Sequence, residues 1–227
     1  MRDGLTHLRV EEQRGYWIVV LDCARGSAPG APNVLSLAVL ADLQALVEEV
    51  ERRRDIAAVI LTGTEAGGFA AGADLRELHR LAPQEAFAFS RRGQLLFRRL
   101  ERARPLFIAA IDGYCIGGGL DLALACDLRY ATTRSVFAHP GARLGLLTGW
   151  GGTARLPRAL GRAEALRLFL TAEPISAAEA LRLGLIHRMT DGDVLALARR
   201  WAEAAVRLGP HAVSHVKGVL GAAMEYR

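Results

Sequence analysis

Two short runs of apolar residues constrain the fold of this 227-residue chain more than any other feature. Residues 56–62 and 106–111 are almost continuously apolar, and a turn rich in glycine follows each run. Such runs are typical of strands that are buried on both faces, as in a parallel sheet with helices on each side. Residues 5–11 and 16–22 are two further candidate strands. The pattern therefore predicts an α/β fold.

Apolar residues at helical spacing occupy most of the remaining chain. Helices are predicted over residues 36–53, 74–102, 120–125, 193–208 and 210–223, with an almost wholly helical pattern from 151 onward. Shorter strands are predicted over 128–131, 136–138 and 186–190, and a loop over 26–33. Ser176 and Glu179 have the spacing of a capping box at a helix start. We expect one α/β core domain over residues 1–192 and the start of a helical extension over 193–227.

The charge balance is moderately basic, with 29 Lys and Arg against 24 Asp and Glu, a net charge of +5. Lys217 is the only lysine, and the arginines are scattered along the chain. Because no basic stripe is interleaved with aromatic residues, nucleic acid is not expected as a partner. No apolar run reaches the ~18 residues of a membrane span, and the first residues lack the order of a secretory signal. The expected location is the cytoplasm.

Residues that commonly bind metals or act as nucleophiles form no recognised pattern here. Cys23, Cys115 and Cys126 lie in apolar segments without CxxC spacing, which indicates buried thiols. His211 and His215 are four residues apart but have no third ligand near them in sequence. Motifs of nucleotide-binding phosphate loops, α/β-hydrolase nucleophiles and zinc proteases are absent. No metal site is predicted.

Two glycine-bearing turns, at 69–75 and 113–122, carry the strongest chemical signal. Small residues leave backbone N–H groups accessible to a ligand, and a helix start adds unsatisfied donors. If the turns face each other, two N–H groups can bind one carbonyl oxygen, as in an oxyanion hole. The alternative is that the glycines at 117–119 only allow a helix and a strand to pack closely. The spacing alone leaves both interpretations open.

Several segments resemble the enoyl-CoA hydratase/isomerase (crotonase) superfamily in the right order. They are residues 71–74, 108–113, 117–119, 125–128, 149–157 and 175–185. The resemblance extends from about residue 16 to 223. It implies a spiral of ββα turns, and a homotrimer or a pair of trimers. It also implies a CoA thioester as substrate, with no cofactor beyond the coenzyme A of that thioester.

The resemblance also implies which residues contact the thioester. Its oxygen would lie between the N–H groups of Ala73 and Gly118, so that an enolate is stabilised. Further residues implied in substrate binding are Ala71, Asp74, Leu75, Arg76, Gly117, His139, Gly141 and Trp150.

Three departures from the family pattern bear on the reaction. Asp121 stands where the family's first catalytic glutamate is expected, and Gly141 stands where the second is expected. Gly149 replaces the additional aspartate of dienoyl-CoA isomerases. The chain also ends at Arg227, earlier than usual for the family, and from this we expect a more weakly assembled trimer.

The roles of the remaining polar residues are open at this stage. Asp121 is either the catalytic acid–base group or an acid that favours the helix dipole. His139 either replaces the missing glutamate or lines the pocket wall, and Trp150 is expected in that wall. With one carboxylate, double-bond isomerisation is favoured over efficient hydration. The alternative function is a non-catalytic acyl-CoA-binding subunit of another enzyme.

Overall fold

The computed structural model describes residues 4–23 and 31–225, so the loop predicted over 26–33 lies largely outside the described residues. The strands are β1 (Leu8–Gln13), β2 (Tyr16–Leu21), β3 (Val34–Leu35), β4 (Ala58–Gly63), β5 (Gly72–Ala73), β6 (Leu106–Ile111), β7 (Tyr114–Ile116), β8 (Leu128–Thr132), β9 (Val136–Ala138), β10 (Ile175–Ser176) and β11 (Arg188–Thr190). The helices are α1 (Leu37–Arg52), α2 (Leu75–Leu78), α3 (Pro83–Arg102), α4 (Gly118–Ala125), the 3₁₀ turn η1 (Pro140–Leu144), α5 (Gly152–Leu160), α6 (Arg162–Thr171), α7 (Ala177–Leu183), α8 (Val194–Leu208) and α9 (Pro210–Glu225).

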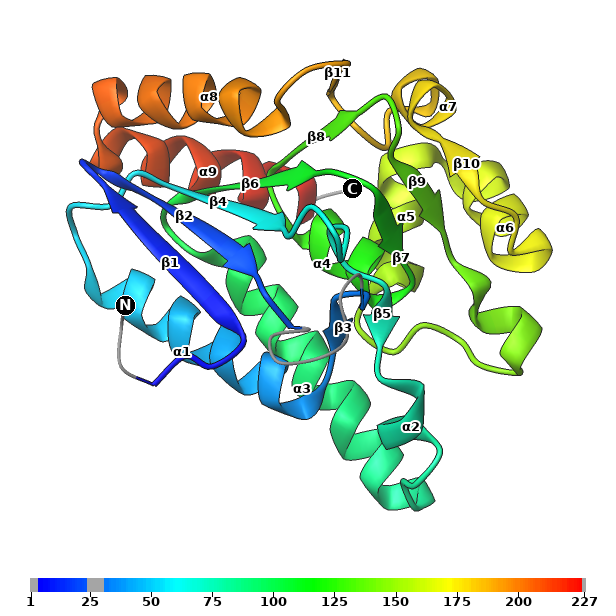
Figure 1. Cartoon of the computed structure of the whole chain (residues 1–227). Coiled ribbons are helices and arrows are strands. Elements are labelled where there is room, and N and C mark those ends of the chain that lie inside the picture. Colours follow the sequence, from blue (N-terminus) through cyan, green and yellow to red (C-terminus); the bar gives the residue numbers. More distant parts are fainter. Residues whose placement is uncertain (1–3, 24–30, 226–227) are drawn as a thin grey trace.

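The main sheet has six strands in the order β1-β2-β4-β6-β8-β11 (Figure 1). Strand β1 pairs antiparallel with β2, and every other pair in this sheet is parallel. Strands β7, β9 and β10 form a second sheet, and β3 pairs with β5. The second sheet and the β3–β5 pair lie beyond the carboxyl ends of the central strands, where the glycine turns emerge (Figure 1).

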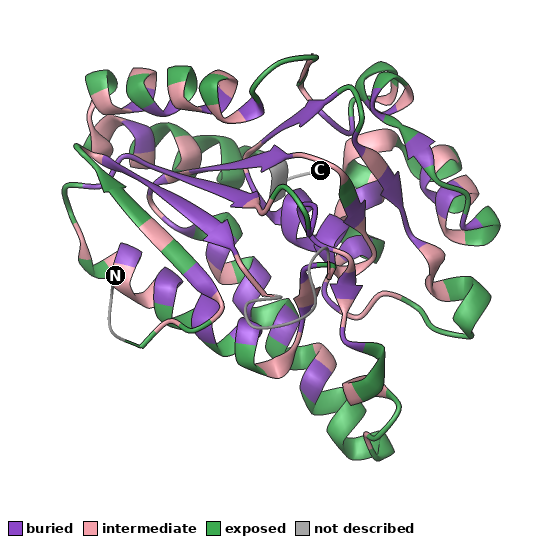
Figure 2. Cartoon of the chain, in the orientation of Figure 1, coloured by how far each residue is buried: buried purple, intermediate pink, exposed green. Residues whose placement is uncertain are grey.

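Both faces of the central strands are buried, as the apolar runs predict (Figure 2). Ile18, Ile60 and Ile108 belong to a cluster with alanines of α8. Their neighbours Val59 and Phe107 belong to the larger cluster with the apolar faces of α1 and α3. Successive residues of a strand point to opposite faces, so one continuous apolar run serves two helical layers.

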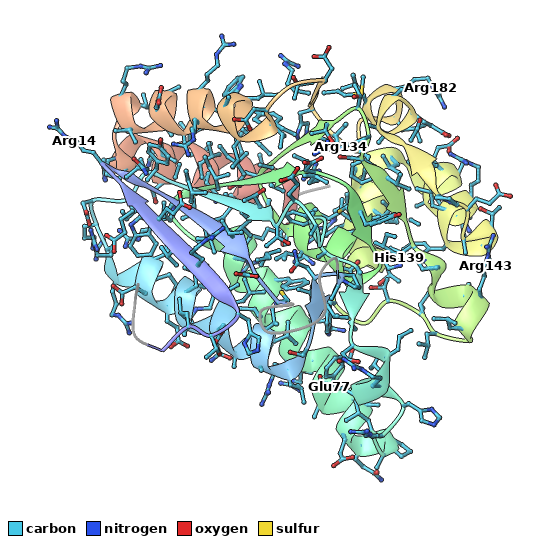
Figure 3. All side chains as sticks on the ribbon, viewed as in Figure 1. Arg14, Glu77, Arg134, His139, Arg143 and Arg182 are labelled. Atoms are coloured by element: carbon cyan, nitrogen blue, oxygen red, sulfur yellow. The ribbon has the colours of Figure 1, made fainter. Side chains whose placement is uncertain are left out.

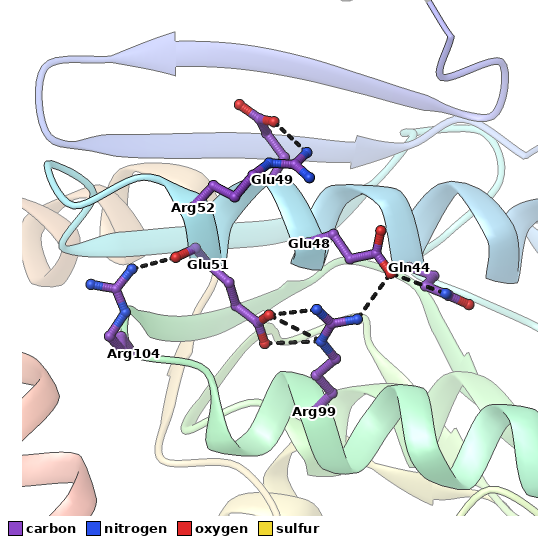
Figure 4. A network of polar contacts seen from close by, with 7 residues as sticks. All are labelled: Gln44, Glu48, Glu49, Glu51, Arg52, Arg99 and Arg104. Carbon is purple, nitrogen blue, oxygen red and sulfur yellow. Dashed lines mark hydrogen bonds and ion pairs between the residues drawn. The ribbon is translucent and has the colours of Figure 1, made fainter.

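An ion network joins α1 to α3 at the surface (Figure 4). The Arg99 guanidinium donates to Glu51 at 2.6 Å and to Glu48 at 2.9 Å. Arg104 donates to the backbone carbonyl of Glu51. Because these groups are partly exposed, the network contributes little stability and mainly orients α3, which borders the candidate site.

Some predicted element boundaries are wrong. The helix predicted over 74–102 is two helices, α2 and α3, because Pro83 disfavours a helical conformation at the residue before it. The first strand begins at Leu8 instead of residue 5, and β11 begins at Arg188. Four short strands, β3, β5, β7 and β10, were not predicted. Each has only two or three residues, which is too few to show a periodic pattern.

One of the two hydrogen bonds of the capping box predicted at Ser176 is confirmed. The Ser176 hydroxyl accepts the Glu179 N–H at 3.2 Å, as an N-cap does. The Glu179 carboxylate binds Arg167 at 2.6 Å. The side chain of Glu179 thus joins α7 to α6.

The C-terminal helices pack on the main sheet. Val194, Ala198 and Ala202 of α8 are buried against it. The Lys217 ammonium on α9 donates to the Pro105 carbonyl at 2.7 Å and to Asp127 at 2.6 Å. The boundary between residues 192 and 193 stays a prediction. None of the helices in the described ranges is long and apolar enough to span a bilayer.

His187 joins β8 to the segment that enters β11. The backbone N–H of Arg129 donates to the His187 ring nitrogen Nδ1 at 3.0 Å. The backbone N–H of His187 donates to the Arg129 carbonyl at 2.8 Å. The Arg129 guanidinium is buried and donates to the carbonyls of Leu185 and Cys126. Burial, and then the charges of Arg129 and Arg188, lower the pKa of His187 to about 4.

We therefore expect acid to destabilise the protein through His187. The folded state binds the proton more weakly than the unfolded chain, so this stability is present above about pH 6.5 and is lost as the pH falls towards 4. Since the side chain is half-buried, the expected loss in the free energy of unfolding is about 1–2 kcal/mol. Urea unfolding of the native protein and of His187→Asn, measured from pH 7 to 4, tests this. Equal pH dependence in the two proteins would contradict it.

Candidate active site

The two glycine turns predicted from the sequence lie against each other. Gly72, in β5, has φ +97°, and Gly117, before α4, has φ +55°, conformations that favour glycine. A β-carbon on Gly72 would lie 3.2 Å from the Gly118 nitrogen, and one on Gly118 would lie 3.4 Å from the Ala73 nitrogen. The backbone amides of Ala73 and Gly118 therefore belong to one small region, as an oxyanion hole requires.

The helix start supplies a donor to this region. Gly118 is the first residue of α4, so its N–H has no acceptor within the helix. The preceding amide, of Gly117, donates to the Ala138 carbonyl at 2.9 Å, which ties the turn to β9. Gly119 serves packing, because a β-carbon there would lie 2.4 Å from the Ala70 carbonyl oxygen. The packing interpretation of the triple glycine is therefore confirmed at Gly119, and the oxyanion role of Gly118 stays a prediction.

Asp121 is a fully buried acid one helical turn after Gly118. Residues three apart in a helix share a face, so its side chain leaves α4 on the same side as the turn. One carboxylate oxygen lies 2.9 Å from His139 Nε2, and the other accepts the Thr148 hydroxyl. A β-carbon on Gly152 would overlap Asp121, so that glycine leaves room for the acid.

His139 is buried and contacts the acid directly. It lies between β9 and η1, and its ring centroid lies 4.9 Å from that of Phe169. We assign the ring proton to Nε2, facing Asp121, which leaves Nδ1 as an acceptor. Figure 3 shows His139 within the fold, whereas Arg14, Arg143 and Arg182 extend from its periphery. His139 and Asp121 thus form a buried acid–imidazole pair.

Gly141 and Gly149, at the positions where the family pattern has acids, make close backbone contacts. A β-carbon on Gly141 would lie 2.9 Å from the Leu146 carbonyl oxygen, and Leu146 donates its N–H to the Gly141 carbonyl. A side chain at 141 therefore requires this turn to shift. The Gly149 carbonyl accepts bonds from Ser90 at 2.9 Å and Gln94 at 2.8 Å, which anchors the following Trp150 to α3.

The segment after Ala73 is polar and partly exposed. Asp74 caps α2, and its carboxylate binds the Arg76 guanidinium at 2.9 Å, which lowers the pKa of Asp74. The side chains of Leu75 and Arg76 are exposed. Glu77 accepts the Leu37 N–H at 2.8 Å, which ties α2 to the start of α1. Ala71 donates its N–H to the Asn33 carbonyl at 2.8 Å, behind the turn.

Metal-ligating side chains and thiols are the other groups that could carry chemistry. Across 4–23 and 31–225 no group of three or more His, Cys, Asp or Glu side chains is arranged to hold a metal ion. Burial raises the pKa of Cys115 well above its usual value, and raises that of Cys126 to about 12. These thiols are therefore protonated at neutral pH and are poor nucleophiles.

Comparison with known proteins identifies this architecture. The family model described as enoyl-CoA hydratase/isomerase matches residues 27–227. The chain belongs to this family. It is an enzyme of the enoyl-CoA hydratase/isomerase type with a crotonase-like spiral fold.

Two curated relatives illustrate the similarity. The short-chain-enoyl-CoA hydratase of Clostridium acetobutylicum is 36% identical over 198 residues, which are 87% of this chain and 76% of that protein. The (E)-benzylidenesuccinyl-CoA hydratase of Thauera aromatica is 39% identical over 196 residues, 85% of this chain and 76% of that protein.

Solved structures of family members agree with the fold. DspI of Pseudomonas aeruginosa superimposes with a TM-score of 0.91 at 34% identity, covering 98% of this chain and 83% of that one. An enoyl-CoA hydratase of Bacillus anthracis has a TM-score of 0.90 at 30% identity, covering 97% and 84%.

Sequence reasoning missed one group at the site. Thr148 is 27 residues from Asp121 in sequence and shows no motif, yet its hydroxyl contacts the carboxylate. Its place directly before Gly149, one of the family's expected acid positions, is a weak signal. The direct contact between His139 and Asp121, 18 residues apart, was also not predicted, although both residues were candidates.

We expect His139 to stabilise the buried Asp121 carboxylate. Replacing His139 by Leu removes one of its two donors and leaves a buried acceptor less satisfied, at a cost of about 1–3 kcal/mol in the free energy of unfolding. In an Asp121→Ala background the same replacement has no carboxylate to affect and costs less. Urea unfolding of the four proteins in this double-mutant cycle measures the coupling. An equal cost in both backgrounds would refute the expected stabilisation.

Proposed function

We propose that this enzyme acts on an enoyl-CoA thioester and shifts its double bond through an enolate. The thioester oxygen is held between the N–H groups of Ala73 and Gly118, and Asp121 carries the proton. The observation that carries the proposal is the contact between the two glycine turns beside a buried acid. Backbone donors aimed at the oxygen stabilise the negative charge that develops there.

The proposed reaction needs one acid–base group. For a 3-enoyl-CoA, Asp121 removes a proton from C2, and the electrons form a dienolate whose oxygen lies between the two amides. The same proton then returns at C4, so the thioester carbonyl is restored and the double bond lies between C2 and C3. Hydration also needs a group that activates water for addition at C3, and Gly141 has no side chain for this task.

The other parts of the proposal follow the family. Asp74, Leu75 and Arg76 line the approach of the CoA moiety, which fits the exposure of Leu75 and Arg76, while the buried Asp74 carboxylate holds the Arg76 guanidinium. Ala71 and Gly117 hold the two turns in place. We also propose that the chain assembles as a trimer or a pair of trimers and works in the cytoplasm. Coenzyme A enters only as part of the substrate, with no separate cofactor.

We expect the native protein to isomerise trans-3-hexenoyl-CoA faster than it hydrates crotonyl-CoA. Asp121→Asn should lower isomerase kcat/KM by about 10²–10⁴-fold, because a general base typically contributes that much. Spectrophotometric assays of both reactions test this, with the surface variant Asp191→Asn as control. Binding of acyl-CoA without turnover of either substrate would instead support the alternative of a non-catalytic acyl-CoA-binding subunit.

The missing second acid gives a separate prediction. Gly141→Glu should raise the ratio of hydration to isomerisation above that of Gly141→Ala, because the carboxylate can activate water. The alanine variant is the matched control, since both side chains displace the turn against the Leu146 carbonyl. The two rates are measured on the same preparations. If both variants show the same ratio, a carboxylate at 141 does not reach the substrate.

A further inference from the structure

Trp150 is a buried wedge between α3 and α4. Its side chain is 3% exposed. A β-carbon on Gly93 of α3 would lie 2.1 Å from Trp150 Cδ1, and one on Gly118 of α4 would lie 2.5 Å from Cζ3. A glycine inside a helix lowers the stability of the helix by about 1 kcal/mol relative to alanine. Gly93 is explained by the Trp150 indole, which leaves no room for a β-carbon at this position. The ring lies directly on both glycine backbones.

The wedge is held in place on the α3 side. The rings of Phe89 and Phe97, each four residues from Gly93 on the same helix face, lie 5.2 and 5.6 Å from the Trp150 ring. The preceding carbonyl, of Gly149, is bonded to two side chains of α3. Aromatic pairs at these distances pack favourably. Trp150 therefore belongs to a rigid aromatic block.

The block lies on the acyl side of the proposed thioester site. Gly118 provides one of the two amides, and the indole edge contacts its backbone. Thr148, two residues before Trp150, contacts Asp121, which acts on the carbons next to the thioester. The proposed CoA side is the segment after Ala73, where Leu75 and Arg76 are exposed. An acyl chain extending past Asp121 into the protein therefore meets the Trp150 block.

We propose that Trp150 closes the acyl site and confines this enzyme to short acyl groups. This inference rests on the proposed function. Replacing the indole by alanine would leave an apolar space on the order of 150 Å³ between Phe89 and Phe97, enough for several methylenes. The competing route for a long chain is outward along the exposed Leu144, Leu146 and Leu147. The two routes predict different chain-length profiles.

The test measures the binding of butyryl-, hexanoyl-, octanoyl- and decanoyl-CoA by calorimetry. These saturated thioesters have no double bond to shift or hydrate. For the native protein the affinity should stop rising beyond four to six carbons. In Trp150→Ala the affinity for octanoyl-CoA relative to butyryl-CoA should rise at least tenfold, since each buried methylene adds about fourfold. Trp201→Ala, which alters the half-exposed tryptophan on α8, should keep the native profile.

The outcomes separate this inference from the proposed function. Affinity that rises steadily with chain length in the native protein would overturn the inference and support the outward route. A folded Trp150→Ala variant with the chain-length profile of the native protein would also overturn the inference. Trp150→Leu, which leaves a smaller space, is the second variant and should give an intermediate gain. If no acyl-CoA binds the native protein, the proposed function itself fails and the inference falls with it.

Discussion

The candidate site depends on the close approach of two backbone turns, and glycine makes that approach possible. Gly72 and Gly117 adopt positive φ angles, Gly119 lies against the Ala70 carbonyl, and Gly118 lies against Trp150. A β-carbon at Gly72 or Gly117 would strain the backbone, one at Gly119 would push the turns apart, and one at Gly118 would displace Trp150. The central strands β4 and β6 pair in parallel, so both turns emerge at the same edge of the sheet, and the buried core thereby positions the candidate site.

The proposed chemistry rests on how the Asp121 carboxylate is held. An aspartate is one methylene shorter than a glutamate, and the Asp121 carboxylate stays inside the protein, where His139 and Thr148 occupy its two oxygens. Low polarity around a buried network strengthens each hydrogen bond and penalises each unpaired group. A single, firmly held acid is suited to carrying one proton between two carbons of a bound enolate.

The sequence predicted those parts of the site that depend on local backbone properties. The two turns and the helix after the second follow from glycine spacing and local apolar pattern, although α4 begins at Gly118, two residues before the predicted start. Asp121 is singled out by the resemblance to the family. The contacts of Asp121 with His139 and Thr148 join residues 18 and 27 positions apart. No local pattern reports such contacts. The partnership of Trp150 with Gly93 is of the same kind.

The sequence by itself determined the α/β class, the doubly buried central strands and the two glycine turns, because burial on two faces and freedom at glycine are properties of short segments. The choice of the Ala73 and Gly118 amides within those turns comes from the resemblance to the family. The tertiary structure alone decided that the turns touch and that His139 faces Asp121. It also decided that Trp150 lies against both Gly93 and Gly118. These contacts arise when separate elements pack, and packing selects partners by shape across the whole chain.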